Sequence, residues 1–286
     1  MTPSFVVARR AFHAGLVDTI LTTDANGVPS IADKSQKTSR DIAVGILNRL
    51  ATARNADRLP GQHMGNTFEA HCEQFLRDCF LKLHHLRPGK WEITRVPSRR
   101  RNVIADYEQY NHLDELETAA KNDETLAASL GNDYSIAPDI LVIRHPEPDE
   151  EINRSGLLVD ERIANRASLR HRVNPMPLVH ASVSCKWTLR SDRAQNARSE
   201  ALNLIRNRKG RCPHICVVIA EPSPSRLASI ALGTGDIDCV YHFALPELVD
   251  SVNELQNCEE PSQMLRIMIE GKRLKDISDL PLDLAV

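Results

Sequence analysis

The sequence predicts an α/β fold in which a central mixed β-sheet is flanked by helices on both faces. From residue 136 onward, short runs of β-branched and aliphatic residues alternate with amphipathic helical patterns, which is typical of a sheet covered by helices. The 286 residues contain no internal repeat, low-complexity linker or glycine-rich phosphate loop. We therefore expect one elaborated domain over residues 1–286, with a core at about 66–245 and supporting helices at both ends.

The first third of the chain predicts mainly helix. Apolar residues recur at the spacing of an amphipathic helix behind a cap at Thr38 or Ser39 and continue to Leu50. The expected elements that follow are helices at residues 68–86 and 107–130 and, between them, a strand at residues 91–96.

The remaining chain predicts strands and helices on either side of a long surface connection. Residues 144–177 are rich in Pro, Glu, Asp, Asn and Arg, which indicates a surface connection with a short helix near residues 159–167. The expected strands are residues 136–143, 178–189, 214–220 and 239–244. The expected helices are residues 192–207, 225–232, 246–255 and 261–274.

Composition indicates a folded protein of a reducing compartment. Apolar residues make up 42% and charged residues 26%, the usual values for globular domains. No apolar run approaches the length of a membrane span and no signal-peptide pattern is visible, so we expect a cytoplasmic protein without a membrane partner. The seven cysteines lack a framework spacing, and Cys212 and Cys216 lack the second pair that a zinc site needs. We expect reduced structural thiols.

Charges are segregated along the chain, although the formal net charge is only −2. Residues 182–211 hold eight Lys and Arg against two Asp and Glu, and residues 87–101 are also basic. Acids collect at residues 106–124 and 147–151. A basic run is most often a solvated helix face, so these runs alone do not identify a partner. They do leave a basic surface that an anionic partner can contact.

One strand that is expected to be buried carries a charge. Lys186 lies within residues 178–189, where an unpaired ammonium would cost on the order of several kcal/mol or lose its proton. The preceding strand supplies Asp139, a carboxylate among aliphatic residues that is equally unfavourable to bury alone. Two neighbouring strands that each place one charge predict a single site at a cleft. A purely structural ion pair is the alternative.

Pro138-Asp139, followed by a strand that carries Lys186, resembles the signature of the PD-(D/E)XK nucleases. That signature has Asp or Glu two residues before the lysine, where this chain has Ser184. Glu200, on the next expected helix, is similar to the variant of restriction endonucleases that cut sites containing CCGG, in which the second acid has moved to that helix. Arg190-Ser-Asp-Arg193 matches the Arg-x-Asp-Arg element of the same subgroup. Outside this region the resemblance rests on length and general layout.

The resemblance implies a type II restriction endonuclease with a restriction-endonuclease-like PD-(D/E)XK core, acting in the bacterial cytoplasm within a restriction-modification system. It implies Mg²⁺-dependent cuts in both strands of palindromic DNA containing CCGG, with GCCGGC as the expected site and 5′-phosphate ends. It also implies two Mg²⁺ ions per active site and a homotetramer, a dimer of dimers, on double-stranded DNA. The alternatives are a catalytically silent DNA-binding or assembly protein on the same fold and a structure-specific repair nuclease.

The residues themselves fit phosphodiester hydrolysis, which needs cations at the phosphate and a positioned water. Asp139 is the best Mg²⁺ ligand, because Mg²⁺ prefers oxygen, and the backbone carbonyl of Cys185 can supply another oxygen. Lys186 can orient or deprotonate the attacking water and hold a phosphate oxygen. The resemblance adds three members to the catalytic pocket, Glu69, Ser184 and Glu200. Covalent attack by Ser184 or Cys185 is disfavoured because no histidine is positioned near them in the sequence.

Base reading is expected where the strand of residues 178–189 ends. Arg190 and Arg193 can each donate two hydrogen bonds to one guanine, and Asp192 can accept a hydrogen bond from cytosine. The alternative is that Asp192 caps the helix while both arginines face solvent. The resemblance alone implies outer contacts to DNA at four further residues, Asp33, Ser35, Gln62 and Arg226.

Overall fold

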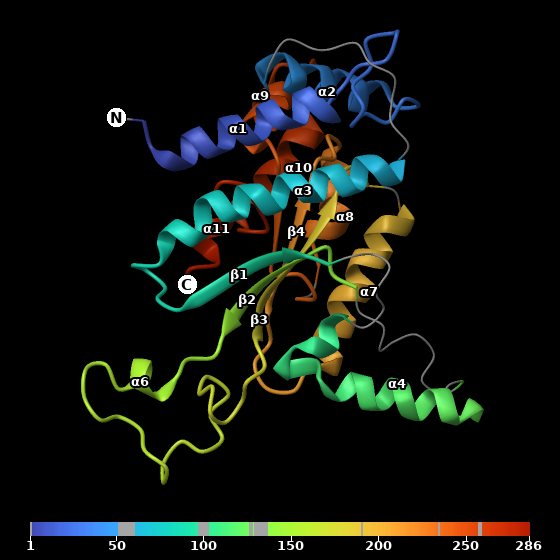
Figure 1. Cartoon of the computed structure of the whole chain (residues 1–286). Helices are drawn as coiled ribbons and strands as arrows, with labels where there is room; N and C mark the ends of the chain where they lie inside the picture. The colour runs from blue at the N-terminus through green and yellow to red at the C-terminus, as the bar shows by residue number, and fades with distance from the viewer. Residues whose placement is uncertain are drawn as a thin grey trace.

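The computed structural model describes residues 2–50, 61–96, 103–125, 128, 137–189, 191–233, 235–256 and 259–286, and for residues 61–62 and 191–193 it describes the backbone alone. Within these residues a single six-stranded sheet runs through the molecule in the order β1-β2-β3-β4-β5-β6 (Figure 1). Its strands are β1 (Lys90–Arg95), β2 (Ile140–His145), β3 (Leu178–Lys186), β4 (His214–Ile219), β5 (Cys239–His242) and β6 (Leu274–Asp276).

The sheet is mixed, as predicted. Strands β1, β2 and β3 pair antiparallel, whereas β3, β4, β5 and β6 pair parallel. Parallel neighbours need crossovers, and α7 (Ser191–Asn207) joins β3 to β4 while α8 (Pro224–Ala231) joins β4 to β5. Because β2 runs against β3, the start of β2 and the end of β3 meet at the same edge of the sheet.

Helices cover both faces of this sheet, which confirms the predicted fold class (Figure 1). Helix α3 (Gly61–Phe80) packs on β1 and β3, with α1 (Ser4–Thr19) packed behind it. Helices α7 and α8 pack against each other, and α8 packs on β5. The other described α-helices are α2 (Lys37–Leu50), α4 (His112–Asn122), α6 (Asp149–Ile152), α9 (Leu245–Asn253), α10 (Glu259–Glu270) and α11 (Leu280–Asp283).

Several expected boundaries are wrong. The helix expected at residues 68–86 begins at Gly61, since its first turns bury Met64, and it ends at Phe80 before a 3₁₀ turn. The helix expected at residues 107–130 begins only at His112, after 3₁₀ turns at Val103–Asp106 and Glu108–Tyr110; α4 ends at Asn122, and the described residues 124, 125 and 128 beyond it are also helical. The strand expected at residues 136–143 begins only at Ile140, so Asp139 stands at its entrance, where its carbonyl accepts a hydrogen bond from Val96 N at 3.0 Å.

The helix expected near residues 159–167 is absent from this described segment, because a buried arginine takes its backbone carbonyls. Arg170 is 1% exposed and binds the Asp149 carboxylate through two nitrogens at 2.9 and 2.6 Å. Its guanidinium also donates to the carbonyls of Asp160 and Ile163. The segment is therefore a loop folded around one cation, and it projects from the sheet beside α6 (Figure 1).

The core runs continuously from α1 through α3 and the sheet to α9 and α11. The six described cysteines are free thiols, which agrees with the prediction of reduced cysteines, while Cys258 lies outside the described residues. In the described part of the chain, no set of three His, Cys, Asp or Glu side chains is arranged to hold a metal ion. None of the described helices combines the length and apolar character needed to cross a bilayer.

Candidate active site

Asp139 and Lys186 meet at the sheet edge where β2 starts and β3 ends. The Nζ atom of Lys186 donates to Asp139 Oδ2 at 3.1 Å. The same oxygen accepts the Cys185 backbone N–H at 2.7 Å and the Ser184 hydroxyl at 3.2 Å. Three donors from one strand end therefore hold this carboxylate, and the two predicted charges occupy one site.

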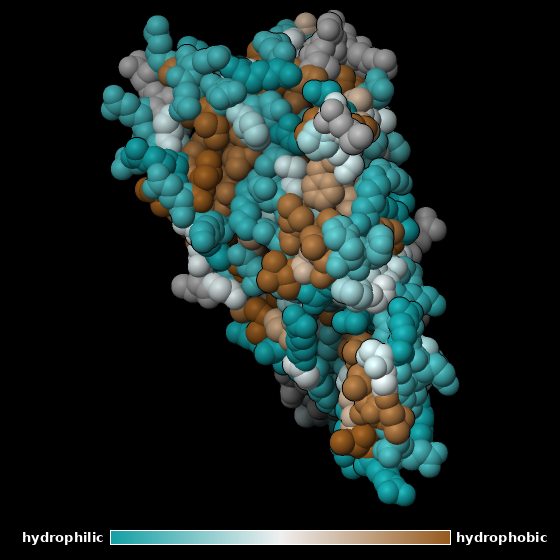
Figure 2. All heavy atoms as spheres, turned by 90° about the vertical axis from the view of Figure 1, so that its left-hand side faces the viewer, coloured by the Kyte–Doolittle hydropathy of each residue, from teal (hydrophilic) through white to brown (hydrophobic). Residues whose placement is uncertain are grey.

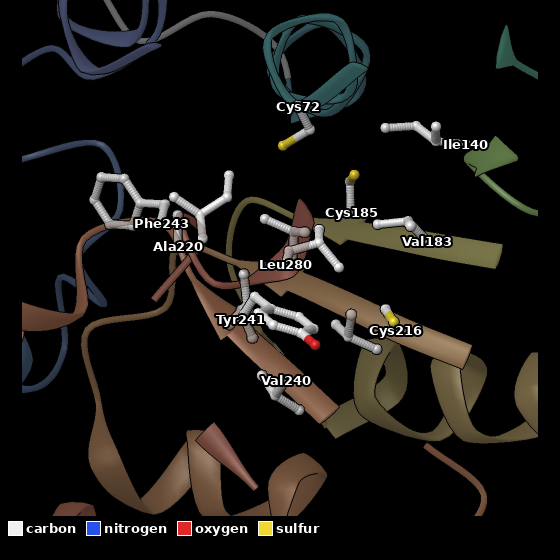
Figure 3. Close-up of a cluster of buried hydrophobic side chains, with 14 of the residues drawn as sticks. Cys72, Ile140, Val183, Cys185, Cys216, Ala220, Val240, Tyr241, Phe243 and Leu280 are labelled. Carbon is white, nitrogen blue, oxygen red and sulfur yellow. The ribbon is translucent and has the colours of Figure 1, made fainter. Parts of the chain in front are cut away.

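The side chains at the end of β3 reach both faces of the sheet, because successive strand residues point to opposite sides. Cys185 points toward α3, where its thiol meets that of Cys72 (Figure 3). Lys186 points to the opposite face of the sheet, where it interacts electrostatically with Glu200 on α7. Asp139 at the edge of the sheet is thus accessible to groups from both helices.

Lys186 remains a cation in this setting. Burial opposes its charge, but the negative charges of Asp139 and Glu200 outweigh burial and raise the pKa of Lys186 above its usual value. Its side chain is only 17% exposed and that of Asp139 is 21% exposed. The ammonium is therefore a fixed donor at the mouth of the site.

Glu200 is brought to the same site by α7. Burial first, and then the charge of Asp139, raise the pKa of Glu200 to about 8, while Lys186 opposes the shift. Its Oε1 atom is buried and has no hydrogen-bond partner among the described residues. A buried carboxyl with an unused oxygen requires either a proton or a cation.

Glu69 approaches from α3. Burial, followed by the charge of Asp139, raises the pKa of Glu69 to about 7, and Lys186 and Arg95 act against this rise. Glu69 and Asp139 line a cavity of ≈ 370 Å³ together with Asn66, Arg95, Val96, Ala137 and Pro138. Arg95 was not singled out from the sequence. It places a guanidinium at this cavity and is held there by Glu73 Oε2 at 2.8 Å.

The carboxylates at this site and the Cys185 carbonyl fit a divalent cation whose remaining ligands come from substrate and water. Asp139, Glu69 and Glu200 disfavour one another's charge, so a cation among them would relieve this repulsion. The N–H of Cys185 points at Asp139, and the carbonyl of a strand residue lies on the same edge as its N–H, so the Cys185 carbonyl also faces this site. Mg²⁺ commonly takes one or two carboxylates and fills its remaining positions with water and phosphate oxygens.

The Arg190-Ser-Asp-Arg193 element begins immediately beyond this site. Arg190 lies outside the described residues, and Asp192 and Arg193 lie in the first turn of α7, where only the backbone is described. Gln62 is likewise described only by its backbone, in the first turn of α3. The structure therefore places the start of α7 a few residues beyond the end of β3 without describing these side chains.

Three of the four expected outer contacts gather beside this element. Arg226 at the start of α8 forms an ion pair with Asp33 and donates to the Leu189 carbonyl at 3.2 Å. Ser35 donates its hydroxyl to Asp33 Oδ1 at 2.7 Å. The hydroxyl and N–H of Ser35, and then Arg226, lower the pKa of Asp33 to about 2, so this carboxylate is ionised.

Glu221, which was also missed from the sequence, lies beneath this group. It lies two residues after the end of β4 and is fully buried, and its Oε2 accepts the Leu189 N–H at 2.9 Å. The available signal was an acid placed directly after the apolar strand predicted at residues 214–220. Nothing in the local sequence shows which segment that acid binds.

Known proteins are similar to this chain over its whole length. The family model described as NgoMIV restriction enzyme matches residues 12–286. The Type II restriction enzyme NgoMIV of Neisseria gonorrhoeae is 58% identical over 287 residues, which cover 100% of this chain and 100% of that protein. These matches confirm the resemblance to restriction endonucleases that was found in the residues around Asp139 and Lys186. The chain belongs to the NgoMIV restriction enzyme family.

Proposed function

We propose that this chain, a type II restriction endonuclease by its family, makes Mg²⁺-dependent double-strand cuts in palindromic DNA containing CCGG, at the sequence GCCGGC. The cuts leave 5′-phosphate ends, and the enzyme acts as one endonuclease domain of a restriction-modification system. The observation that carries the proposal is the contact of Lys186 with Asp139 at 3.1 Å, next to two further acids and beside the start of α7.

The acids and one carbonyl would hold Mg²⁺. Asp139 and the Cys185 carbonyl are the proposed direct ligands for two ions per active site, and Glu69 and Glu200 hold the water around them. When bound, Mg²⁺ supplies positive charge to the phosphate and makes a nearby water more acidic. The raised pKa values of Glu69 and Glu200 support this assignment, since a cation is what would favour their ionised forms.

Lys186 orients the reactants in this proposal. Hydrolysis forms a bond from a water oxygen to phosphorus and breaks the bond from phosphorus to the 3′ oxygen. Because Asp139 and Glu200 raise the pKa of Lys186, it acts as an ammonium that donates to the attacking water or to a phosphate oxygen, and it does not act as a base. Ser184 keeps Asp139 in place through its hydroxyl.

Base recognition is proposed at the start of α7 and around Asp33. Arg190, Asp192 and Arg193 read the inner base pairs in the major groove, because two guanidinium forks and one carboxylate suit G·C pairs. The outer pairs are read by the group Asp33, Ser35, Gln62 and Arg226. The contact of Arg226 with the Leu189 carbonyl supports this division, since Leu189 directly precedes Arg190 in the chain.

The enzyme is proposed to act as a tetramer formed by two dimers. A dimer on a palindrome uses each reading element twice. The projecting loop at residues 146–177 provides surface for further association, since Leu157 is 83% exposed and Leu158 and Ile163 also face solvent (Figure 2). Exposed apolar groups gathered on one projection are typical of a protein interface.

Cleavage of plasmid DNA tests the proposed function. With Mg²⁺ we expect discrete fragments that end at GCCGGC, and with EDTA we expect intact plasmid. Site-specific binding without cleavage would instead identify a silent DNA-binding protein, and cutting that follows DNA structure would identify a repair nuclease. The Asp139→Asn variant should bind the same DNA without cutting it, which separates the metal ligand from the reading residues.

A further inference from the structure

A buried carboxylate connects the two proposed reading elements. Glu221 has no exposed surface, and each of its side-chain oxygens accepts a backbone N–H. Oε2 accepts the N–H of Leu189 at 2.9 Å, and Oε1 accepts the N–H of Ser223 at 3.1 Å. Leu189 precedes α7, and Ser223 precedes α8, so one side chain binds the starts of both segments.

Arg226 completes this arrangement from the other side of Leu189. Its Nη1 atom donates to the Leu189 carbonyl at 3.2 Å and lies 3.6 Å from Glu221 Oε2. Its other terminal nitrogen pairs with Asp33. The N–H and the carbonyl of a single residue, Leu189, are therefore held by Glu221 and Arg226, and these two side chains are themselves close enough to form an ion pair.

The position of Leu189 matters because it is directly followed by the Arg190-Ser-Asp-Arg193 element. A bidentate contact between arginine and guanine requires both nitrogens to lie at hydrogen-bond distance, and a displacement of about 1 Å is enough to lose it. Arg226 is subject to the same requirement at the outer base pair. A group that moves Leu189 therefore moves both reading sets together.

We propose that Glu221 is a positioning residue for specificity. It fixes the positions of Leu189 and Arg226 relative to each other, so that the inner and outer base pairs are read together. The proposal rests on the assignment of Arg226 and of Arg190, Asp192 and Arg193 as base readers. Glu221 has no exposed surface that could contact DNA, and its side-chain hydrogen bonds go to Leu189 and Ser223 rather than to the proposed metal ligands. Its effect passes through the two groups it holds.

A purely structural role for Glu221 makes a different prediction. Loss of a buried acceptor would then lower stability and reduce cleavage of all DNA sites by the same factor. A positioning role instead changes the ratio of kcat/KM between GCCGGC and altered sites. That ratio is independent of the fraction of enzyme that is folded, so it separates the two roles.

The test compares Glu221→Gln and Glu221→Ala with two controls. Glu221→Gln keeps the volume and one acceptor oxygen, so it serves even if Glu221→Ala fails to fold. Asp276→Asn is the matched control, since Asp276 is also a buried carboxylate that accepts a backbone N–H, that of Leu245 at 3.0 Å. Arg226→Ala is the control for loss of an outer reader together with its contact to the Leu189 carbonyl.

For each enzyme, kcat/KM is measured on GCCGGC, on a site changed at the outer pair and on a site changed at the inner pair. We expect Glu221→Gln to lower both discrimination ratios by about fivefold or more, the size of one weakened bidentate contact. Asp276→Asn should leave both ratios within twofold of wild type even where it lowers the melting temperature. Arg226→Ala should lower the outer ratio more than the inner one, because it removes a proposed outer reader as well as one of the two contacts that hold Leu189.

Unchanged ratios for Glu221→Gln, or a change at the outer pair alone, would overturn the role of Glu221 while leaving the proposed function standing. A wild-type enzyme that shows no preference for GCCGGC would overturn the proposed function, and the role of Glu221 in reading it would fall with it. The two failures are distinguishable because the second is seen in the wild-type enzyme before any variant is made.

Discussion

Replacement of Glu200 by Gln should make the metal-free protein more stable while abolishing most of its cleavage. The pKa of Glu200 is raised to about 8 from an ordinary value of 4.5, first by burial and then by Asp139. The folded state therefore binds a proton that the unfolded chain has released at neutral pH. A group with this sign of shift lowers stability as the pH rises from the unfolded pKa to the folded pKa.

The magnitude follows from the two pKa values. Compared with a Glu200 whose pKa is the same in both states, this raised pKa lowers the free energy of unfolding by about 2 kcal/mol at pH 6 and by about 4 kcal/mol at pH 8. Because Glu200 shares its field with Asp139 and Glu69, we expect about half of this difference, on the order of 1 kcal/mol between the two pH values. Glutamine resembles the protonated acid and does not titrate, so the free energy of unfolding of Glu200→Gln should lack the pH dependence that Glu200 contributes.

Urea unfolding in EDTA at pH 6 and pH 8 measures the effect. Relative to wild type, Glu200→Gln should gain more stability at pH 8 than at pH 6, and Mg²⁺ should stabilise wild type more than the variant. Glu254→Gln, a change of a largely exposed acid on the surface, is the matched control and should show no such pH-dependent gain. Equal stability changes at the two pH values would refute the reasoning, because they would show that Glu200 is already ionised in the folded protein.

Three further changes test other parts of the molecule. Asp139→Asn should lower the cleavage rate on the order of a thousandfold, because it removes a proposed metal ligand. Its DNA affinity, measured in Ca²⁺, should stay within about tenfold of wild type. Retained cutting would contradict the role of Asp139 as a ligand. Arg226→Ala should reduce discrimination at the outer base pair by about 1–3 kcal/mol in competition binding, and an unchanged preference would exclude it as an outer reader. Leu157→Ser combined with Leu158→Ser should lower the mass measured by light scattering, whereas an unchanged mass would show that this loop is no interface.

The central strands could be predicted because each is a short run of apolar residues in the sequence. Strands β3, β4 and β5 are short apolar runs that are buried on nearly every residue, and they lie within a few residues of the expected ranges. Strand β6 has only three residues, and its neighbour α11 only four. Elements of that length are stabilised by the surfaces they pack on, so the periodicity of the chain did not reveal them.

The loop around Arg170 shows where local sequence was misleading. Residues 159–167 have an acceptable helical pattern, yet the carbonyls of Asp160 and Ile163 turn toward Arg170. That guanidinium is paired with Asp149, at the other end of the connection. A long-range ion pair outweighed a short helix because an isolated helix of this length is marginal in water.

The sequence by itself indicated the class of this enzyme, because Pro138-Asp139, Lys186 and Glu200 resemble the signature of restriction endonucleases and the family comparison confirms that class. Only the tertiary structure decided how these groups affect one another. The raised pKa values of Glu69 and Glu200 depend on burial and on Asp139, which comes from a distant segment. The role of Glu221 depends on a contact with Leu189, thirty-two residues earlier in the chain. Such couplings arise from distance and dielectric environment in the folded chain, and neither quantity is encoded in a local pattern.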